Sequence, residues 1–133
     1  MIVNTLSSVY GAVATWRRRW YAGDPARTRV LDRPVISVGN LRAGGSGKTP
    51  VVAHIARLLV AEGERPSILS RGYARSRPQD GVTVVSSPAG VVGNLAVSGD
   101  EPLMLARMLP GVPVLVGPDR FLSGRLAERQ FGV

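Results

Sequence analysis

The sequence predicts an α/β fold in which a mostly parallel sheet is flanked by helices. From residue 34 onward, short runs rich in β-branched residues alternate with segments of helical apolar spacing. Such alternation is typical of parallel strands joined by right-handed crossovers. A glycine-rich stretch at 44–49 lies between the first run and the first helix of this alternation, where a phosphate-binding loop would lie. We therefore expect a P-loop NTPase-like sheet of three or four strands, preceded by a separate N-terminal helix.

The first 21 residues predict an amphipathic helix. Its apolar residues recur at spacings of three or four, at Ile2, Leu6, Val9, Val13, Trp16 and Trp20. Arginines at 17–19 close the segment, which leaves two interpretations open. The helix could pack within a protein, with its cationic end matching the helix dipole. It could instead lie on a membrane, with tryptophan at headgroup depth and arginine on anionic lipid.

Other membrane and export signals are weak. A membrane-spanning helix needs about 18 consecutive apolar residues, and no apolar run in the sequence is that long. The arginines follow the apolar part, whereas those of a secretory signal peptide precede it.

A polar connector at 22–33 leads into the alternation. Residues 34–38 (PVISV) predict a buried strand because they form a short apolar, β-branched run. A loop at 39–47 follows, and then a helix over 49–62. Pro50 suits the first turn of that helix, and Gly63 suits its end.

The remaining elements are expected in the same alternating order. A strand is predicted at 66–70, followed by a basic loop at 71–80. A small hairpin is predicted with arms at 82–85 and 95–97 around the turn at 88–90. There follow a helix over 100–108, a strand at 113–116, a helix over 119–130 that Gly124 could interrupt, and the approach to a further strand at 131–133.

Composition excludes several classes of site. The chain of 133 residues has no cysteine and one histidine, which excludes disulfides and thiolate metal sites and makes a Ser-His-Asp triad hard to build. The formal net charge is +8, and residues 1–50 carry eight basic and two acidic residues. That excess favours an anionic ligand or surface near the N-terminus. With seven aromatic residues and no nucleic-acid motif, a nucleic-acid partner is not expected.

The glycine-rich stretch has the residue types that a triphosphate site needs. Glycines allow backbone amides to turn toward a phosphate, and the following helix N-terminus adds partial positive charge. Lysine would bridge the β- and γ-phosphates, and the threonine hydroxyl would ligate Mg²⁺. The residues concerned are Gly44, Gly45, Ser46, Gly47, Lys48 and Thr49.

One departure from the P-loop pattern is present, because Arg42 stands where GxxxxGK[ST] has glycine. The stretch could therefore be a plain strand-to-helix turn with an exposed lysine. Against this, Lys48 is the only lysine among 17 basic residues, at a position where a compact ammonium suits the site better than a guanidinium.

Residues 38–50 (VGNLRAGGSGKTP) resemble the tetraacyldisaccharide 4'-kinase family of lipid A biosynthesis. Three further motifs of that family follow in order: Ser70–Tyr73 (SRGY), Gly99–Pro102 (GDEP) and Asp119-Arg120. The N-terminal helix is similar to the family's membrane-associated segment. The resemblance covers essentially the whole chain, and the combination of motifs is specific where the phosphate loop alone would be generic.

The resemblance implies a reaction. Family members transfer the γ-phosphate of ATP to the 4'-hydroxyl of tetraacyldisaccharide 1-phosphate, giving lipid IV-A. They do so with Mg²⁺, at the cytoplasmic face of the bacterial inner membrane. The acylated disaccharide lipid and that membrane surface, reached through the N-terminal helix, are thus the implied partners, and the oligomeric state stays open.

The resemblance also assigns residues. It implies that Lys48 and Thr49 hold the triphosphate and Mg²⁺, and that Asp100 activates the sugar hydroxyl. Glu101 is the motif neighbour of Asp100. Together with Arg71 and Arg120 it would contact substrate or phosphate.

The expected organisation is an N-terminal helix and connector at 1–33 followed by a kinase domain at 34–133. The resemblance implies that this chain is the N-terminal portion of such a kinase. Family members continue with a strand, an acidic motif that completes Mg²⁺ binding, and a second domain.

Structural interpretations compete with several of these assignments. Ser98 and Glu101 fit a capping box that would explain Asp100 without catalysis. Asp119 fits an N-cap, and His54 an exposed helix position. At the level of function, the alternatives are another P-loop phosphotransferase or GTPase with a soluble substrate, and a nucleotide- and membrane-binding fragment without turnover.

Overall fold

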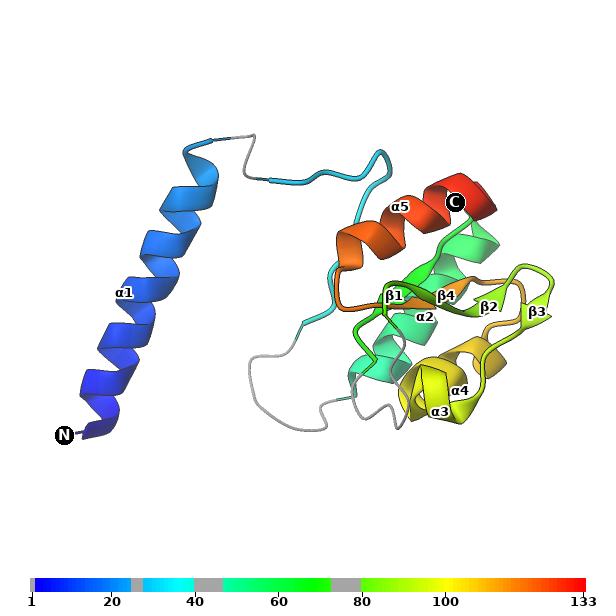
Figure 1. The fold of residues 1–133 in the computed structure, drawn as a ribbon, viewed down its shortest axis with the longest axis horizontal. Helices are drawn as coiled ribbons and strands as arrows, with labels where there is room; N and C mark the ends of the chain where they lie inside the picture. The colour runs from blue at the N-terminus through cyan, green and yellow to red at the C-terminus, as the bar shows by residue number, and fades with distance from the viewer. Residues whose placement is uncertain (1, 25–27, 40–46, 73–79) are drawn as a thin grey trace. The chain divides into compact units, whose positions relative to one another are not determined.

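A computed structural model describes residues 2–24, 28–39, 47–72 and 80–133, with side chains described from residue 11 onward. The chain divides into two units, Met1–Val30 and Leu31–Val133. Figure 1 labels the helices and strands of both units.

The first unit contains the helix α1 (Ile2–Ala22), which lies where the apolar spacing predicts a helix. Just after its last residue, the Gly23 N–H donates to the Arg19 carbonyl at 3.0 Å. Trp16 is 66% exposed, and Trp20 packs edge-on against Tyr21 with ring centroids 5.0 Å apart. Arg17 lies over the Tyr21 ring at 5.8 Å. Among the residues that the structure describes, no helix is long and apolar enough to cross a bilayer.

The described residues of the second unit form a four-stranded mixed sheet of order β1-β4-β2-β3. Its strands are β1 (Ile68–Ser70), β2 (Thr83–Ser87), β3 (Gly90–Val91) and β4 (Val114–Val116). β1 and β4 are parallel, whereas β2 is antiparallel to both β4 and β3. The expectation of a mostly parallel sheet was therefore wrong, because the β2–β3 hairpin supplies two antiparallel pairings.

Helices cover both faces of this sheet (Figure 1). α4 (Asp100–Met108) contacts β2, β3 and β4, and α5 (Arg120–Phe131) contacts β1 and β4. α2 (Lys48–Ala61) packs against α4. Successive side chains of a strand point to opposite faces of the sheet, so the fully buried β4 contributes side chains to the packing on both faces. Val114 and Val116 join the core with α2 and α4, and Leu115 lies on the other face.

The three helices predicted for this unit are confirmed within one or two residues at each end. α5 runs through Gly124 without interruption. The strands predicted at 66–70 and 113–116 are confirmed as β1 and β4.

The buried strand predicted at 34–38 is not present. The segment carries no strand pairing, and Val35 and Ile36 are 65% and 59% exposed. A β-branched composition favours an extended backbone, but it does not by itself supply a hydrogen-bonded neighbour. Among the described strands β1 lies at one edge of the sheet, and residues 34–38 do not pair with it.

The second hairpin arm was also placed wrongly. β3 is formed by residues 90–91 and begins at the last residue of the predicted turn, and residues 95–98 form the short helix α3 (Leu95–Ser98). The cause is Asn94, whose side-chain oxygen accepts from the N–H groups of Ala96 at 3.1 Å and Val97 at 3.3 Å. An asparagine N-cap of this kind starts a helix where the apolar pattern alone suggested a strand.

The connector is held to α5 by a close apolar contact. A Cβ placed on Gly124 would lie 2.3 Å from Leu31 Cδ1 and 2.9 Å from its Cδ2. These distances are far inside van der Waals contact, so Leu31 rests directly on the bare backbone of α5. Gly124 is buried in this contact.

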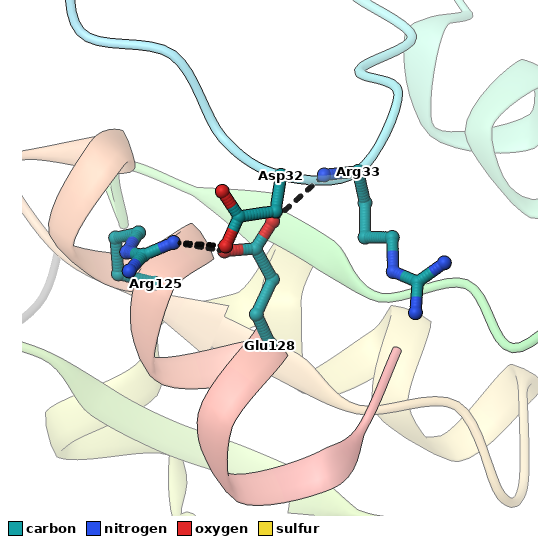
Figure 2. Close-up of polar contacts among 4 residues, drawn as sticks. All are labelled: Asp32, Arg33, Arg125 and Glu128. Carbon is teal, nitrogen blue, oxygen red and sulfur yellow. Dashed lines mark hydrogen bonds and ion pairs between the residues drawn. The ribbon is translucent and has the colours of Figure 1, made fainter.

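Polar groups next to Leu31 reinforce this attachment, as Figure 2 shows. Arg125 pairs with Asp32, and it also pairs with Glu128 at 3.1 Å. The other Glu128 oxygen accepts from the backbone N–H of Arg33 at 2.9 Å. The Asp32 carboxylate raises the pKa of the Arg125 guanidinium above its ordinary value, so this residue stays cationic. The chain is therefore anchored to α5 just before the segment that leads to α2.

This attachment predicts that Gly124→Ala has opposite effects in two backgrounds. In the unmodified chain the added methyl group displaces Leu31, so stability in urea unfolding should fall. In the Leu31→Ala background the three atoms nearest to the added methyl group, Leu31 Cγ, Cδ1 and Cδ2, are removed. The higher helix propensity of alanine should then stabilise the protein by about 1 kcal/mol. An equal effect in both backgrounds would contradict the contact.

Candidate functional site

The N-terminus of α2 carries the described part of the phosphate-loop motif. Gly47 is the N-cap, with φ 71°, a left-handed conformation that favours glycine. Lys48 and Thr49 are the first two residues of the helix. Amides of a first helical turn have no acceptor within the helix, and the helix dipole favours an anion there. Gly44, Gly45 and Ser46, predicted to contact phosphate, lie outside the described residues.

The N-terminus of α4 meets that of α2 through one hydrogen bond. The Thr49 hydroxyl donates to Glu101 Oε1 at 2.5 Å, across 52 positions of sequence. Asp100, the predicted catalytic residue, is the exposed first residue of α4 and precedes Glu101 directly. The GDEP motif is thus joined to the phosphate-loop motif through Glu101 and Thr49, and Asp100 and Lys48 are their chain neighbours.

A capping box does not explain these acidic residues. The N-cap of α4 is Gly99, with φ 81° and no side-chain cap, and Ser98 ends the preceding helix α3. The Ser98 hydroxyl is buried without a partner, and it faces Gly93, where a Cβ would lie only 2.4 Å away. The alternative interpretation, with Ser98 as the N-cap, was wrong because Gly99 turns the chain between the two helices.

The remaining predicted site residues follow the parallel strands. Arg71 comes directly after β1 and is exposed, and Arg120 is the exposed first residue of α5 after β4. The Gly117 N–H donates to the Ser70 carbonyl at 3.0 Å, which holds the two strand ends together. Asp119 accepts from the N–H groups of Phe121 at 2.9 Å and Leu122 at 3.4 Å, so its predicted role as N-cap is confirmed.

Topology brings these positions to one edge of the sheet. α2 leads into β1, and α4 leads into β4, so each helix begins near the carboxyl end of the strand that follows it. Ligands of α/β sheets bind at that edge. It receives Lys48, Thr49, Asp100 and Glu101 from the helix N-termini and Arg71 and Arg120 from the strand ends.

Two features of this site bear on metal binding. Thr49 and Glu101 supply hard oxygen atoms, the ligand type that Mg²⁺ prefers. Among the described residues there is no cluster of three or more His, Asp or Glu side chains that could hold a metal by itself. The single histidine, His54, is exposed on α2, in agreement with its prediction as a helix surface residue.

Sequence reasoning missed the pairing of Thr49 with Glu101. The sequence offered one indirect signal, since each residue lies one position after the start of a helix that begins behind a glycine. A second tie between the same helices runs from the Arg57 guanidinium to the Met108 carbonyl at 3.4 Å. Neither contact has a sequence spacing that could have identified it.

Fold and site together define an α/β protein with two helix N-termini and several charged residues gathered at one sheet edge. The sequence profile of the family described as tetraacyldisaccharide-1-P 4'-kinase matches residues 1–133. The chain belongs to this family.

Individual relatives agree with this assignment. A tetraacyldisaccharide 4'-kinase from Geobacter sulfurreducens is 46% identical over 124 residues, which cover 93% of this chain and 35% of the relative. One from Pelobacter propionicus is 47% identical over 93% of this chain and 34% of the relative. The chain therefore spans about a third of the length of these relatives.

A solved structure shares the fold. LpxK from Aquifex aeolicus, in a crystal structure described as an "apo" form in complex with ATP, superposes with a TM-score of 0.78. It is 37% identical in sequence, and the match covers 99% of this chain and 42% of the LpxK chain.

The cap at Asp119 can be separated from any functional role of the Asp119-Arg120 motif. Asp119→Asn keeps a side-chain oxygen for the two amides, so the free energy of unfolding should change little. Asp119→Ala removes the cap and should cost about 1 kcal/mol in urea unfolding. Equal stability of the two variants would contradict the capping role.

Proposed function

We propose that this chain forms the nucleotide-binding part of an ATP-dependent kinase. Its reaction is transfer of the γ-phosphate to the 4'-hydroxyl of tetraacyldisaccharide 1-phosphate, giving lipid IV-A. The observation that carries the proposal is the meeting of Thr49 with Glu101 at 2.5 Å, because it joins two family motifs at one sheet edge. The names of the relatives supply the substrate.

The nucleotide would bind at the N-terminus of α2 in a P-loop. The backbone amides of Gly44 to Thr49 would surround the phosphates, with Gly47 turning the chain into the helix. Lys48, the first residue of the helix, would place a compact positive charge on the β- and γ-phosphates. The ATP complex of the Aquifex relative supports ATP as the nucleotide.

Mg²⁺ fits the oxygen atoms beside this loop. Thr49 would hold the ion directly, and Glu101 is close enough to contribute to its charge environment. Since Mg²⁺ usually retains several waters and binds substrate phosphates, two protein oxygens are a reasonable share of its ligands. When bound, the ion would supply positive charge against the charge that develops on the transferred phosphoryl group.

Asp100 would accept the proton of the attacking sugar hydroxyl. It is exposed at the start of α4, next to the residue that contacts Thr49. A carboxylate fixed at a helix start can orient the hydroxyl and take up its proton as the new bond forms. Arg71 and Arg120 would contact the anionic lipid or phosphate from the ends of β1 and β4.

The N-terminal helix would bring the site to its lipid substrate, at the cytoplasmic face of the bacterial inner membrane. Described side chains of α1 support an interfacial role, because Trp16, Trp20 and Tyr21 are exposed beside three consecutive arginines. Tryptophan and tyrosine favour the headgroup region, and arginine favours anionic lipid. On this proposal α1 is amphipathic and lies in the membrane surface.

The role of Lys48 predicts the outcome of Lys48→Ala in the whole protein. Phosphate transfer from ATP to tetraacyldisaccharide 1-phosphate should fall at least about a hundredfold, because the charge on the β- and γ-phosphates is lost. Arg57→Ala is the matched control, since it removes a positive charge from the same helix away from its N-terminus. Near-normal transfer by Lys48→Ala would overturn the assignment.

The role of α1 predicts binding to lipid vesicles. The protein should sediment with phosphatidylglycerol vesicles, and Trp16→Ala with Trp20→Ala should weaken binding by roughly tenfold through lost aromatic burial. Exposed Leu122 on α5 provides the matched control, as Leu122→Ala removes an apolar side chain outside α1. Equal binding by all variants would contradict an interfacial helix.

A further inference from the structure

We infer that Glu101 makes nucleotide binding at the α2 N-terminus depend on a divalent cation. The inference rests on the proposed function, and it gives Glu101 a task of its own: to select the metal-bound form of the nucleotide. Glu101 thereby acts through charge and through Thr49, and proton uptake is left to Asp100.

The Glu101 carboxylate lies next to the first turn of α2. Glu101 Oε1 lies 2.5 Å from the Thr49 hydroxyl, and Thr49 is the second residue of α2. A phosphate held by the first-turn amides of α2 would therefore sit close to a negative charge. Among the described residues, no cation is ion-paired with Glu101 to cancel that charge. The repulsion between the Glu101 carboxylate and such a phosphate is comparable in free energy to the stabilisation that one hydrogen bond to the phosphate provides.

The direction of the hydrogen bond between Thr49 and Glu101 also limits what Thr49 can offer a ligand. A hydroxyl has one hydrogen and two lone pairs. In this structure the hydrogen is donated to Glu101, so the oxygen can offer only lone pairs to a ligand. Thr49 cannot then donate to a phosphate oxygen, as it could if Glu101 were absent.

Both effects favour the same ligand. The Thr49–Glu101 pair presents acceptors and negative charge on the side where the phosphates would bind, and hard cations prefer that environment. A metal-free triphosphate meets repulsion at this pair, and a metal-bound triphosphate does not. Glu101 also orients the Thr49 lone pairs, which makes it a positioning residue for the ion.

The test compares ATP binding with and without Mg²⁺ by isothermal titration calorimetry on the whole protein. In Glu101→Gln the charge is lost, and the amide can donate to a phosphate. We expect metal-free ATP, measured with EDTA, to bind about fivefold tighter than in the unmodified protein. The ratio of the ATP affinity with Mg²⁺ to the ATP affinity without it should fall by a similar factor.

Two further variants make the result specific. Glu62→Gln removes the same charge from the far end of α2, about 20 Å away along the helix, and should leave both affinities unchanged. Thr49→Val removes the lone pairs but keeps the carboxylate. Metal-free ATP should then bind as weakly as before, while the benefit from Mg²⁺ falls.

The outcomes separate this inference from the proposed function. If the unmodified protein binds ATP but Glu101→Gln leaves the Mg²⁺ dependence unchanged, the inference about Glu101 is wrong and the nucleotide site stands. If Glu62→Gln has the same effect as Glu101→Gln, general charge explains the result and the inference fails. If no form of ATP binds at all, the proposed function and this inference both fall.

Discussion

The complete burial of β4 is the constraint on which the rest of the second unit depends. Val114, Leu115 and Val116 are fully buried, so both faces of the strand must be covered and both of its edges must be paired. α2 and α4 cover one face and α5 contacts the other, while β1 and β2 take the edges. Because α2 and α4 each run back against the strand they precede, both begin at the carboxyl edge of the parallel pair. The same packing that stabilises the core therefore gathers Lys48, Thr49, Asp100 and Glu101.

Sequence reasoning succeeded where structure is set by nearby residues. The helices that became α2, α4 and α5 were predicted because apolar spacing, Pro50 and the Asp119 cap are local signals. It failed at 34–38, because a β-branched run says nothing about whether the segment pairs with a neighbouring strand. It also failed at 95–98, where the Asn94 cap outweighed an apolar pattern. The alternative interpretation of Ser98 as a cap failed for a related reason, since Gly99 turns the chain before α4 begins.

The candidate site shows the same division. The motifs themselves could be identified from sequence, and the resemblance to a kinase family followed from their order. What could not be predicted is how they meet, because Thr49 and Glu101 are 52 positions apart and their contact depends on the packing of α2 on α4. The attachment of Leu31 to Gly124 is long-range in the same way. It anchors the connector to α5, so the chain leading toward the phosphate loop starts from a fixed point on the core.

The central claim is that this sheet edge serves transfer of phosphate from ATP to an acylated disaccharide. The most direct test incubates the whole protein with Mg²⁺, tetraacyldisaccharide 1-phosphate and ATP whose γ-phosphate carries a heavy oxygen isotope, and locates the label in the lipid from its isotope shift in phosphorus–proton NMR correlation. The account predicts label at the 4'-oxygen of the disaccharide and dependence on both ATP and lipid. Label at another hydroxyl, or release of free phosphate at the same rate with and without lipid, would contradict it.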